Sequence, residues 1–215
     1  VLGLWEAEEQ SGVDTPDYVW DRVARWLLLT QDENGGFGYQ GNPSDGLGDY
    51  VKQSGVRHSM VAAGMGSLYI AKDRLGIRKL KKGALDDTPS VFEPFETTAE
   101  RKARIKTKIE LRYFSRAISR GNRWIEDKYE IDDLKNWQYY SIYAYERYQT
   151  LREAEEASGP AYLDNKARTN WYHLGAKYLI DEQEVDGSWD GQAGVVPSTC
   201  FATLFLLGST RKSLE

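Results

Sequence analysis

The residues that could carry acid–base or metal chemistry in this sequence are few and widely separated. Cys200 is the only cysteine, and His58 and His173 are the only histidines. Zinc sites are built from Cys and His ligands that recur at short intervals along the chain. Because no such interval occurs here, the sequence predicts no metal site and no cofactor.

Two acidic loops contain oxygen ligands of the kind that calcium prefers. One loop holds Asp32, Glu33 and Asn34, and the other holds Asp186 and Asp190. Neither loop follows a recognised spacing of calcium ligands. Asp and Asn side chains also accept hydrogen bonds from nearby backbone amides in turns. We therefore expect turn formation in both loops, with calcium binding as the alternative.

The candidates for ligand binding are polar and aromatic residues at the expected starts of two interior helices. The sequence contains seven Trp and fourteen Tyr residues, and such an excess fits either a packed helical core or a cavity lined with aromatic rings. The alternative is a capping role for the polar residues and a core position for the tyrosines. The candidate ligand-binding residues are Arg57, His58, Trp137, Tyr139, Tyr140 and Tyr143.

Helices must position these residues, because apolar side chains recur every three or four positions along most of the chain. Helices with one apolar face alternate with helices that are apolar on nearly all sides, as expected for exterior helices followed by interior ones. No segment alternates with a period of two for long enough to predict a strand. The sequence therefore predicts an all-α fold. The expected helices span about 17–30, 56–73, 98–129, 137–151 and 171–182, and a last helix, capped by Ser198, ends at about 207.

An internal repeat organises these helices. An aromatic-aliphatic pair is followed after the same intervals by Gln, Gly and a second aromatic residue, once near the start of the chain and once near its end. The front half of the pattern occurs a third time in between. A pattern of this length is typical of tandem structural units. The residues of the repeat motif are Trp26, Gln31, Gly35, Phe37, Trp124, Tyr178, Gln183, Gly187 and Trp189.

The repeat motif predicts a corner between two helices. A Gln at the end of an outer helix can bond to backbone carbonyls that lack a partner there, and the Gly permits a left-handed turn. The second aromatic residue would then pack over the Gln. Gln31 and Gln183 are accordingly interpreted as structural residues.

Length and charge limit the function further. The 215 residues carry a net charge of −5, so the whole molecule has no general attraction to nucleic acid. The basic residues between Arg101 and Arg123 are interpreted as a solvated helix face. No apolar run approaches the length of a membrane-spanning helix, so no membrane span is expected. The sequence does not predict a localisation.

The chain is expected to form a single domain over residues 1–215. Val1 to Ala7 has the composition of a helix that lacks a start signal, which suggests a fragment of a longer chain. The expected units are the end of a preceding repeat at 1–12, repeat one at 17–73, a charged insertion at 74–110, repeat two at 111–151 and repeat three at 170–210.

This pattern resembles the prenyltransferase and squalene-oxidase repeat of the terpenoid-cyclase and protein-prenyltransferase superfamily. The first copy departs from it at Val23 and Phe37, and the last departs at Leu174. The runs 139–147 and 199–206 resemble, more narrowly, bacterial repeat proteins related to squalene-hopene cyclase. The resemblance implies an α/α toroid of outer and inner helix pairs, in which six pairs close a ring and the inner helices point their N-terminal ends toward a central cavity.

In such a toroid this chain would supply an incomplete ring of three to four pairs. The remaining pairs would come from a longer polypeptide or be replaced by a protein partner. The resemblance also implies an apolar or isoprenoid-like ligand in the cavity.

The resemblance does not extend to catalytic residues. Related cyclases protonate an alkene with an Asp-x-Asp-Asp-Thr run that opens an inner helix, whereas the matching positions 56–59, 137–140 and 196–199 contain no carboxylate. Glu130, Asp132 and Asp133 precede the expected inner helix and are interpreted as a turn or cap. We therefore expect a ligand-binding or interaction module without catalytic residues. The alternatives are a cyclase-like enzyme whose acid lies outside this segment, and a carbohydrate-active toroid with paired carboxylates.

Overall fold

A computed structural model describes residues 1–77, 106–131, 134, 137–156 and 165–208, with only the backbone described for 165–169. These ranges contain α1 (Leu2–Ser11), α2 (Asp17–Leu29), α3 (His58–Arg74), α5 (Leu111–Lys128), α6 (Gln138–Glu156), α7 (Asn165–Asp181) and α8 (Val195–Leu206). Within them only two isolated β-bridges occur, at 31–37 and 47–49, and no strand. The prediction of an all-α fold is confirmed.

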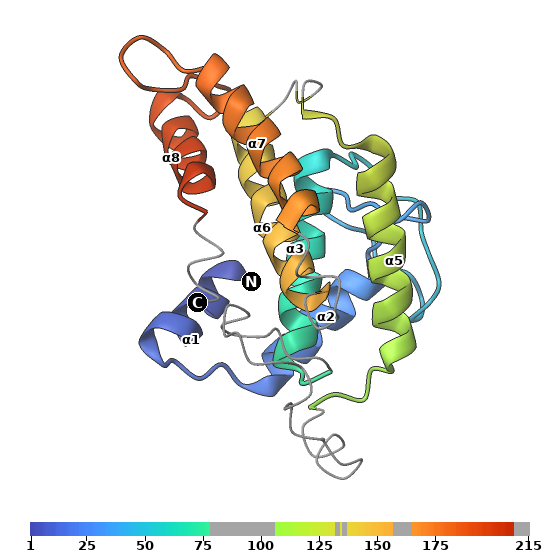
Figure 1. The fold of residues 1–215 in the computed structure, drawn as a ribbon. Coiled ribbons are helices and arrows are strands. Elements are labelled where there is room, and N and C mark those ends of the chain that lie inside the picture. Colours follow the sequence, from blue (N-terminus) through green and yellow to red (C-terminus); the bar gives the residue numbers. More distant parts are fainter. Residues whose placement is uncertain (78–105, 132–133, 135–136, 157–164, 209–215) are drawn as a thin grey trace.

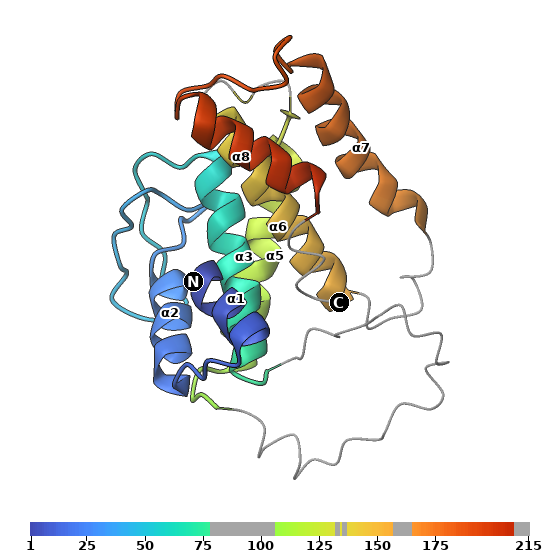
Figure 2. The same ribbon diagram turned by 90° about the vertical axis from the view of Figure 1, so that its left-hand side faces the viewer.

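Three helices form a row through the middle of the molecule. α6 packs between α3 and α8, while α2 and α5 pack on α3 and α7 packs on α8 (Figures 1 and 2). The sequence explains the difference between the two kinds of helix. α3 buries residues on nearly every side, whereas α2 buries only a stripe at steps of four, which consists of Trp20, Ala24 and Leu28.

The buried apolar residues form two clusters. The larger cluster joins α1, α2, α3 and α5 to one part of α6. The smaller cluster joins the start of α6 to α7 and α8, with Ile142, Leu179 and Phe205 among its buried members. Tyr129 packs against both clusters. α6 therefore contributes to both clusters, and Tyr129 links them.

Buried polar contacts fix the helices of the larger cluster. Asn122 of α5 donates to the Tyr69 hydroxyl at 3.1 Å and accepts from the Tyr148 hydroxyl at 3.0 Å, which ties α5 to both α3 and α6. Burial raises the pKa of both tyrosines well above the ordinary range, so both remain neutral. Lys72 of α3 pairs with Glu155 of α6 at 2.6 Å. These contacts orient helices that apolar packing alone would leave free to slide.

Three predicted helix starts differ from the observed ones. The helix expected from 98 begins at Leu111, because Lys106–Glu110 is not helical and the Thr107 hydroxyl accepts the Ile109 amide at 3.0 Å; residues 98–105 lie outside the described ranges. α7 begins earlier than expected, at Asn165. Ser198 lies inside α8, which follows Gly194, so its predicted capping role is wrong.

No helix in the described part of the chain is both long and apolar enough to cross a lipid bilayer.

Candidate functional site

The first Gln-Gly-aromatic segment, residues 31–37, forms a buried corner after α2; we call it the N-terminal corner. The Gln31 side-chain amide donates to Gly35 O at 3.0 Å and to Ala117 O at 2.9 Å. Gly35 has φ 99°, which favours glycine. Because Ala117 belongs to α5, a single buried amide closes the corner and attaches it to that helix.

The second such segment, residues 183–189, repeats this geometry after α7; we call it the C-terminal corner. The Gln183 side-chain amide donates to Gly187 O at 2.8 Å, and Gly187 has φ 86°. Two backbone hydrogen bonds also match. The Asp32 amide donates to Gly36 O as the Glu184 amide donates to Ser188 O, both at 2.9 Å. The Gly35 amide donates to Asp32 O at 2.8 Å, as the Gly187 amide donates to Glu184 O at 2.9 Å. Two segments far apart in the sequence therefore fold into the same local structure.

The acidic loops form turns at both corners. Asn34 Oδ1 accepts the Gly36 amide, and Asp186 Oδ1 accepts the Ser188 amide, each at 3.0 Å. The hydroxyl and amide of Ser188 hold the pKa of Asp186 below its usual value. Asp32 is buried and accepts backbone amides at both of its oxygens. Within the described ranges, no three His, Cys, Asp or Glu side chains come together in a way that could hold a metal ion.

The aromatic ends of the corners differ in how they pack. The Trp189 indole donates to Leu179 O at 2.7 Å and so covers the end of α7. Phe37 has no such donor, and its ring lies directly over Gly64 of α3. Both aromatic side chains are buried, at 5% exposure each.

The middle copy of the motif has a different ending. Tyr129 follows α5 where a Gln would stand, and its ring stacks on Tyr145 of α6 with a centroid distance of 3.7 Å. Burial raises the pKa of Tyr129 well above its usual range. Ring stacking between α5 and α6 thus takes the place of the amide corner.

The candidate residues at the start of α3 serve different neighbours. A ring nitrogen of His58 lies 2.7 Å from Lys128 O, at the end of α5, and the ring lies beside Trp124 and Tyr129. A His in this position satisfies a carbonyl at a helix C-terminus. Arg57 precedes α3 and is exposed.

The other candidates gather where α6 and α8 begin. A shallow depression that is open to solvent is lined by Trp137, Gln138, Tyr139, Tyr140, Gln192, Ala193, Ser198 and Phe201. Tyr140 and Tyr143 lie 5.3 and 5.5 Å from the Phe201 ring, centroid to centroid. Tyr139 is buried, at 4% exposure, and closes the floor against Gly191. We call Trp137, Tyr140 and Phe201 the aromatic surface.

Trp137 has an unusual backbone conformation. It precedes α6, its carbonyl accepts the Ser141 amide at 2.8 Å, and it has φ 56°. A bulky residue in this left-handed region is strained, and such strain is often found at functional sites. The Trp137 side chain is nevertheless 43% exposed. Packing therefore does not account for a Trp at this position.

The structure brings some of the predicted residues together and separates others. Trp137, Tyr139 and Tyr140 line one depression, with Tyr143 beside it, but Arg57 and His58 do not line it. Gln192, Ser198 and Phe201 also line the depression, and no sequence pattern indicated them as ligand-binding residues. Their part in the site depends on α8 packing against α6, which a single sequence does not specify. Asp132 and Asp133 lie outside the described residues, and Glu130 is exposed.

Comparison of this chain with protein-family models, with curated proteins and with solved structures finds no match.

Proposed function

We propose that this chain is an arc of an α/α toroid that acts as a binding module without catalytic residues. The row α3–α6–α8 would be the inner layer, and α2, α5 and α7 the outer layer. The proposal is supported by two corners that share their side-chain and backbone hydrogen bonds. It is also supported by α5, which packs on the inner helix of the preceding unit and receives that unit's corner.

The aromatic surface is the proposed binding site. The observation that carries this proposal is Trp137, which is strained at φ 56° and yet 43% exposed. The site lies at the N-terminal ends of two inner helices, where the resemblance places ligand contacts. The depression encloses essentially no volume, whereas pockets for small-molecule ligands begin at roughly 300 Å³. The proposed ligand group is therefore a single ring or branched apolar end that lies against the aromatic surface, such as the end of an isoprenoid-like chain, rather than an enclosed polyene.

Replacing Trp137 by Gly tests this proposal. Glycine adopts the observed φ without strain, so the free energy of unfolding is expected to be unchanged or to rise by about 1 kcal/mol. Binding of the apolar fluorescent probe N-phenyl-1-naphthylamine is expected to weaken about tenfold, as on loss of an aromatic binding anchor. Tyr39→Gly is the matched control, because Tyr39 is 74% exposed in a loop that does not line the depression. Equal probe binding by the wild type and Trp137→Gly would refute the proposed site.

A further inference from the structure

The C-terminal corner lacks the neighbour that covers the N-terminal corner. Gln31 is 0% exposed, whereas Gln183 is exposed and, among the described residues, its side chain bonds only to Gly187. Leu28 and Ile180 each lie three residues before the Gln, yet Leu28 is 4% exposed and Ile180 is 66% exposed. The difference therefore lies in what packs against each corner.

The glycines of the two corners show the same contrast. A methyl group added at Gly35 would lie 2.4 Å from Arg120 O of α5. At Gly187 the nearest atom to such a methyl group would be the corner's own Gln183 side chain, at 3.9 Å. Within the described ranges, a helix backbone thus lies directly against the N-terminal corner, and none lies against the C-terminal corner.

The surface of α5 that contacts the N-terminal corner has an exposed counterpart on α2. On α5, Trp124 is 6% exposed, and its indole nitrogen would lie 3.2 Å from a methyl group on Gly36 of the N-terminal corner. On α2, Trp26 occupies the same motif position and is 49% exposed. Ala117, whose carbonyl receives Gln31, precedes Trp124 by seven residues, as Val19 precedes Trp26. Among the described residues, the C-terminal corner is therefore exposed, and so is a surface of α2 that corresponds to the α5 surface in contact with the N-terminal corner.

The charges of these two exposed parts are complementary. Residues 181–190 include five acidic side chains and no basic one, namely Asp181, Glu182, Glu184, Asp186 and Asp190. The exposed side of α2 carries Arg22 and Arg25, which precede Trp26 by four residues and by one. Arg25 also pairs with Asp21 of the same helix at 3.8 Å. The N-terminal corner follows the same rule, since Glu33 belongs to it and α5 presents Arg116 and Arg120. Opposite charges favour this pairing over a pairing of like surfaces.

We propose that two copies of this chain associate head to tail, with the C-terminal corner of one copy on α2 of the next. The Gln183 amide donates to the main-chain carbonyl of Val19 in the other copy, as the Gln31 amide donates to that of Ala117 in the internal contact. Ile180 is buried in the interface, and Trp26 is covered by the corner. Because the two surfaces differ, the interface is heterologous, and every open assembly leaves one free corner and one free α2 surface until a ring closes. This inference does not involve Trp137 or the aromatic surface.

The experiment uses one variant for each surface. Ile180→Lys places a cation opposite Arg22 and Arg25, and Trp26→Glu places an anion opposite the acidic corner. Both positions are exposed in the single chain, so circular dichroism and urea unfolding should show a fold like that of the wild type. Tyr39→Lys, at a 74% exposed position outside both surfaces, is the control. Sedimentation over a range of concentrations, up to millimolar, measures the mass of each protein.

The wild type and Tyr39→Lys are expected to grow beyond a dimer with concentration, and each of the two surface variants is expected to remain a monomer. An equimolar mixture of the two variants retains one intact corner and one intact α2 surface, so it is expected to form dimers and to stop there. Gln183→Ala is expected to weaken wild-type association about tenfold. A monomeric wild type, association of either variant alone, or a mixture that stays monomeric would each overturn the proposal.

Discussion

The same side chain makes the same bond at two places in this molecule, but its surroundings differ. Gln31 and Gln183 both donate to the carbonyl of a glycine four residues later. Gln31 also reaches a carbonyl of α5 in a buried position, where water cannot replace the donor. A hydrogen bond contributes most when its loss leaves a buried partner unsatisfied. The energetic value of the motif is therefore set by burial.

Alanine at each position measures this difference. Gln31→Ala removes two buried hydrogen bonds and is expected to lower the free energy of unfolding by about 2–3 kcal/mol. Gln183→Ala removes one exposed bond and is expected to cost about 0.5 kcal/mol or less. Urea unfolding at a concentration where the protein is monomeric gives both values. Equal losses would show that the bond to Ala117 adds nothing to the corner's stability.

The helices depend on close contacts at two glycines. Gly121 of α5 and Gly175 of α7 occupy the same motif position, and a methyl group at either would collide with a side chain of α3 or α8. The partners are Met65 Sδ at 2.0 Å and Phe205 Cζ at 2.2 Å. Glycine is unfavourable inside a helix by about 1 kcal/mol relative to alanine. At these two positions, close packing therefore favours glycine, although helix propensity favours alanine.

Glycine-to-alanine exchanges test which of these effects is larger. Gly121→Ala is expected to destabilise the protein by about 1–3 kcal/mol, because overpacking against the buried Met65 exceeds the gain in helix propensity. Gly3→Ala is the control, since Gly3 lies in α1 with no other atom within 4 Å of the added methyl group. That change is expected to stabilise by about 0.5–1 kcal/mol. Thermal and urea unfolding give both values, and a stabilising Gly121→Ala would contradict the packing argument.

Local patterns in the sequence were sufficient to predict the corners. Spacing alone identified the two corners that share hydrogen bonds, and the apolar periodicity identified the helices on either side. Helix starts were less predictable, because local side-chain bonds such as that of Thr107 compete with helix formation. Only part of the aromatic surface could be predicted from the sequence. Trp137 and Tyr140 come from one helix start, but Phe201 joins them through the packing of α8 on α6, which depends on tertiary contacts.

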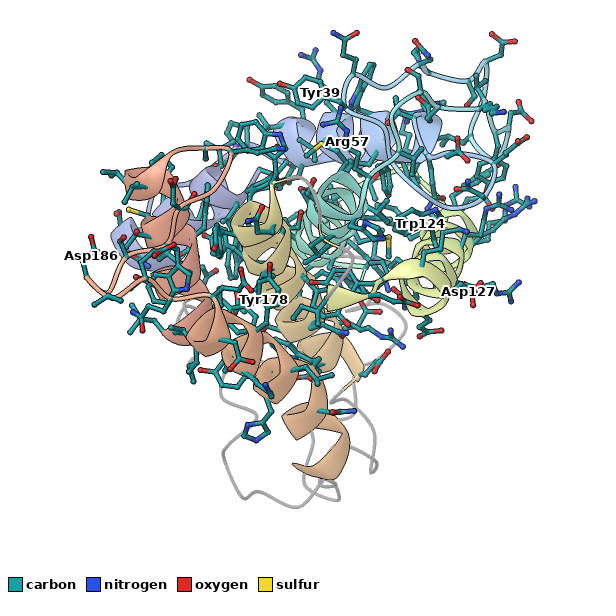
Figure 3. The ribbon with its side chains drawn as sticks, turned by 90° about the horizontal axis from the view of Figure 1, so that it is seen from above. Tyr39, Arg57, Trp124, Asp127, Tyr178 and Asp186 are labelled. Carbon is teal, nitrogen blue, oxygen red and sulfur yellow. The ribbon has the colours of Figure 1, made fainter. Side chains whose placement is uncertain are left out.

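Across the whole molecule, the two core clusters are unequal. α3 is buried on nearly every side and has α1, α2, α5 and α6 as neighbours. α7 packs mainly on α8, and among its described side chains Leu179 is fully buried while Leu174 and Ile180 are 49% and 66% exposed. The C-terminal corner that follows α7 lies at the edge of the molecule, where Figure 3 shows Asp186 away from Trp124 of α5. Among the described helices, burial therefore falls from α3 to α7.

This gradient should appear as a gradient in local stability. Helices with few buried contacts open without global unfolding, and their amides exchange with solvent through those openings. Amides of α7 in the monomeric protein are expected to exchange with an opening free energy about 2–4 kcal/mol below that of α3 and α6. Hydrogen exchange followed by mass spectrometry resolves the three helices as separate peptides. Head-to-tail association would raise the protection of α7 and of residues 183–189 while leaving α3 unchanged. Equal protection of α7 and α3 in the monomer would mean that the two clusters unfold as one unit, and that the exposed apolar side chains of α7 do not weaken it.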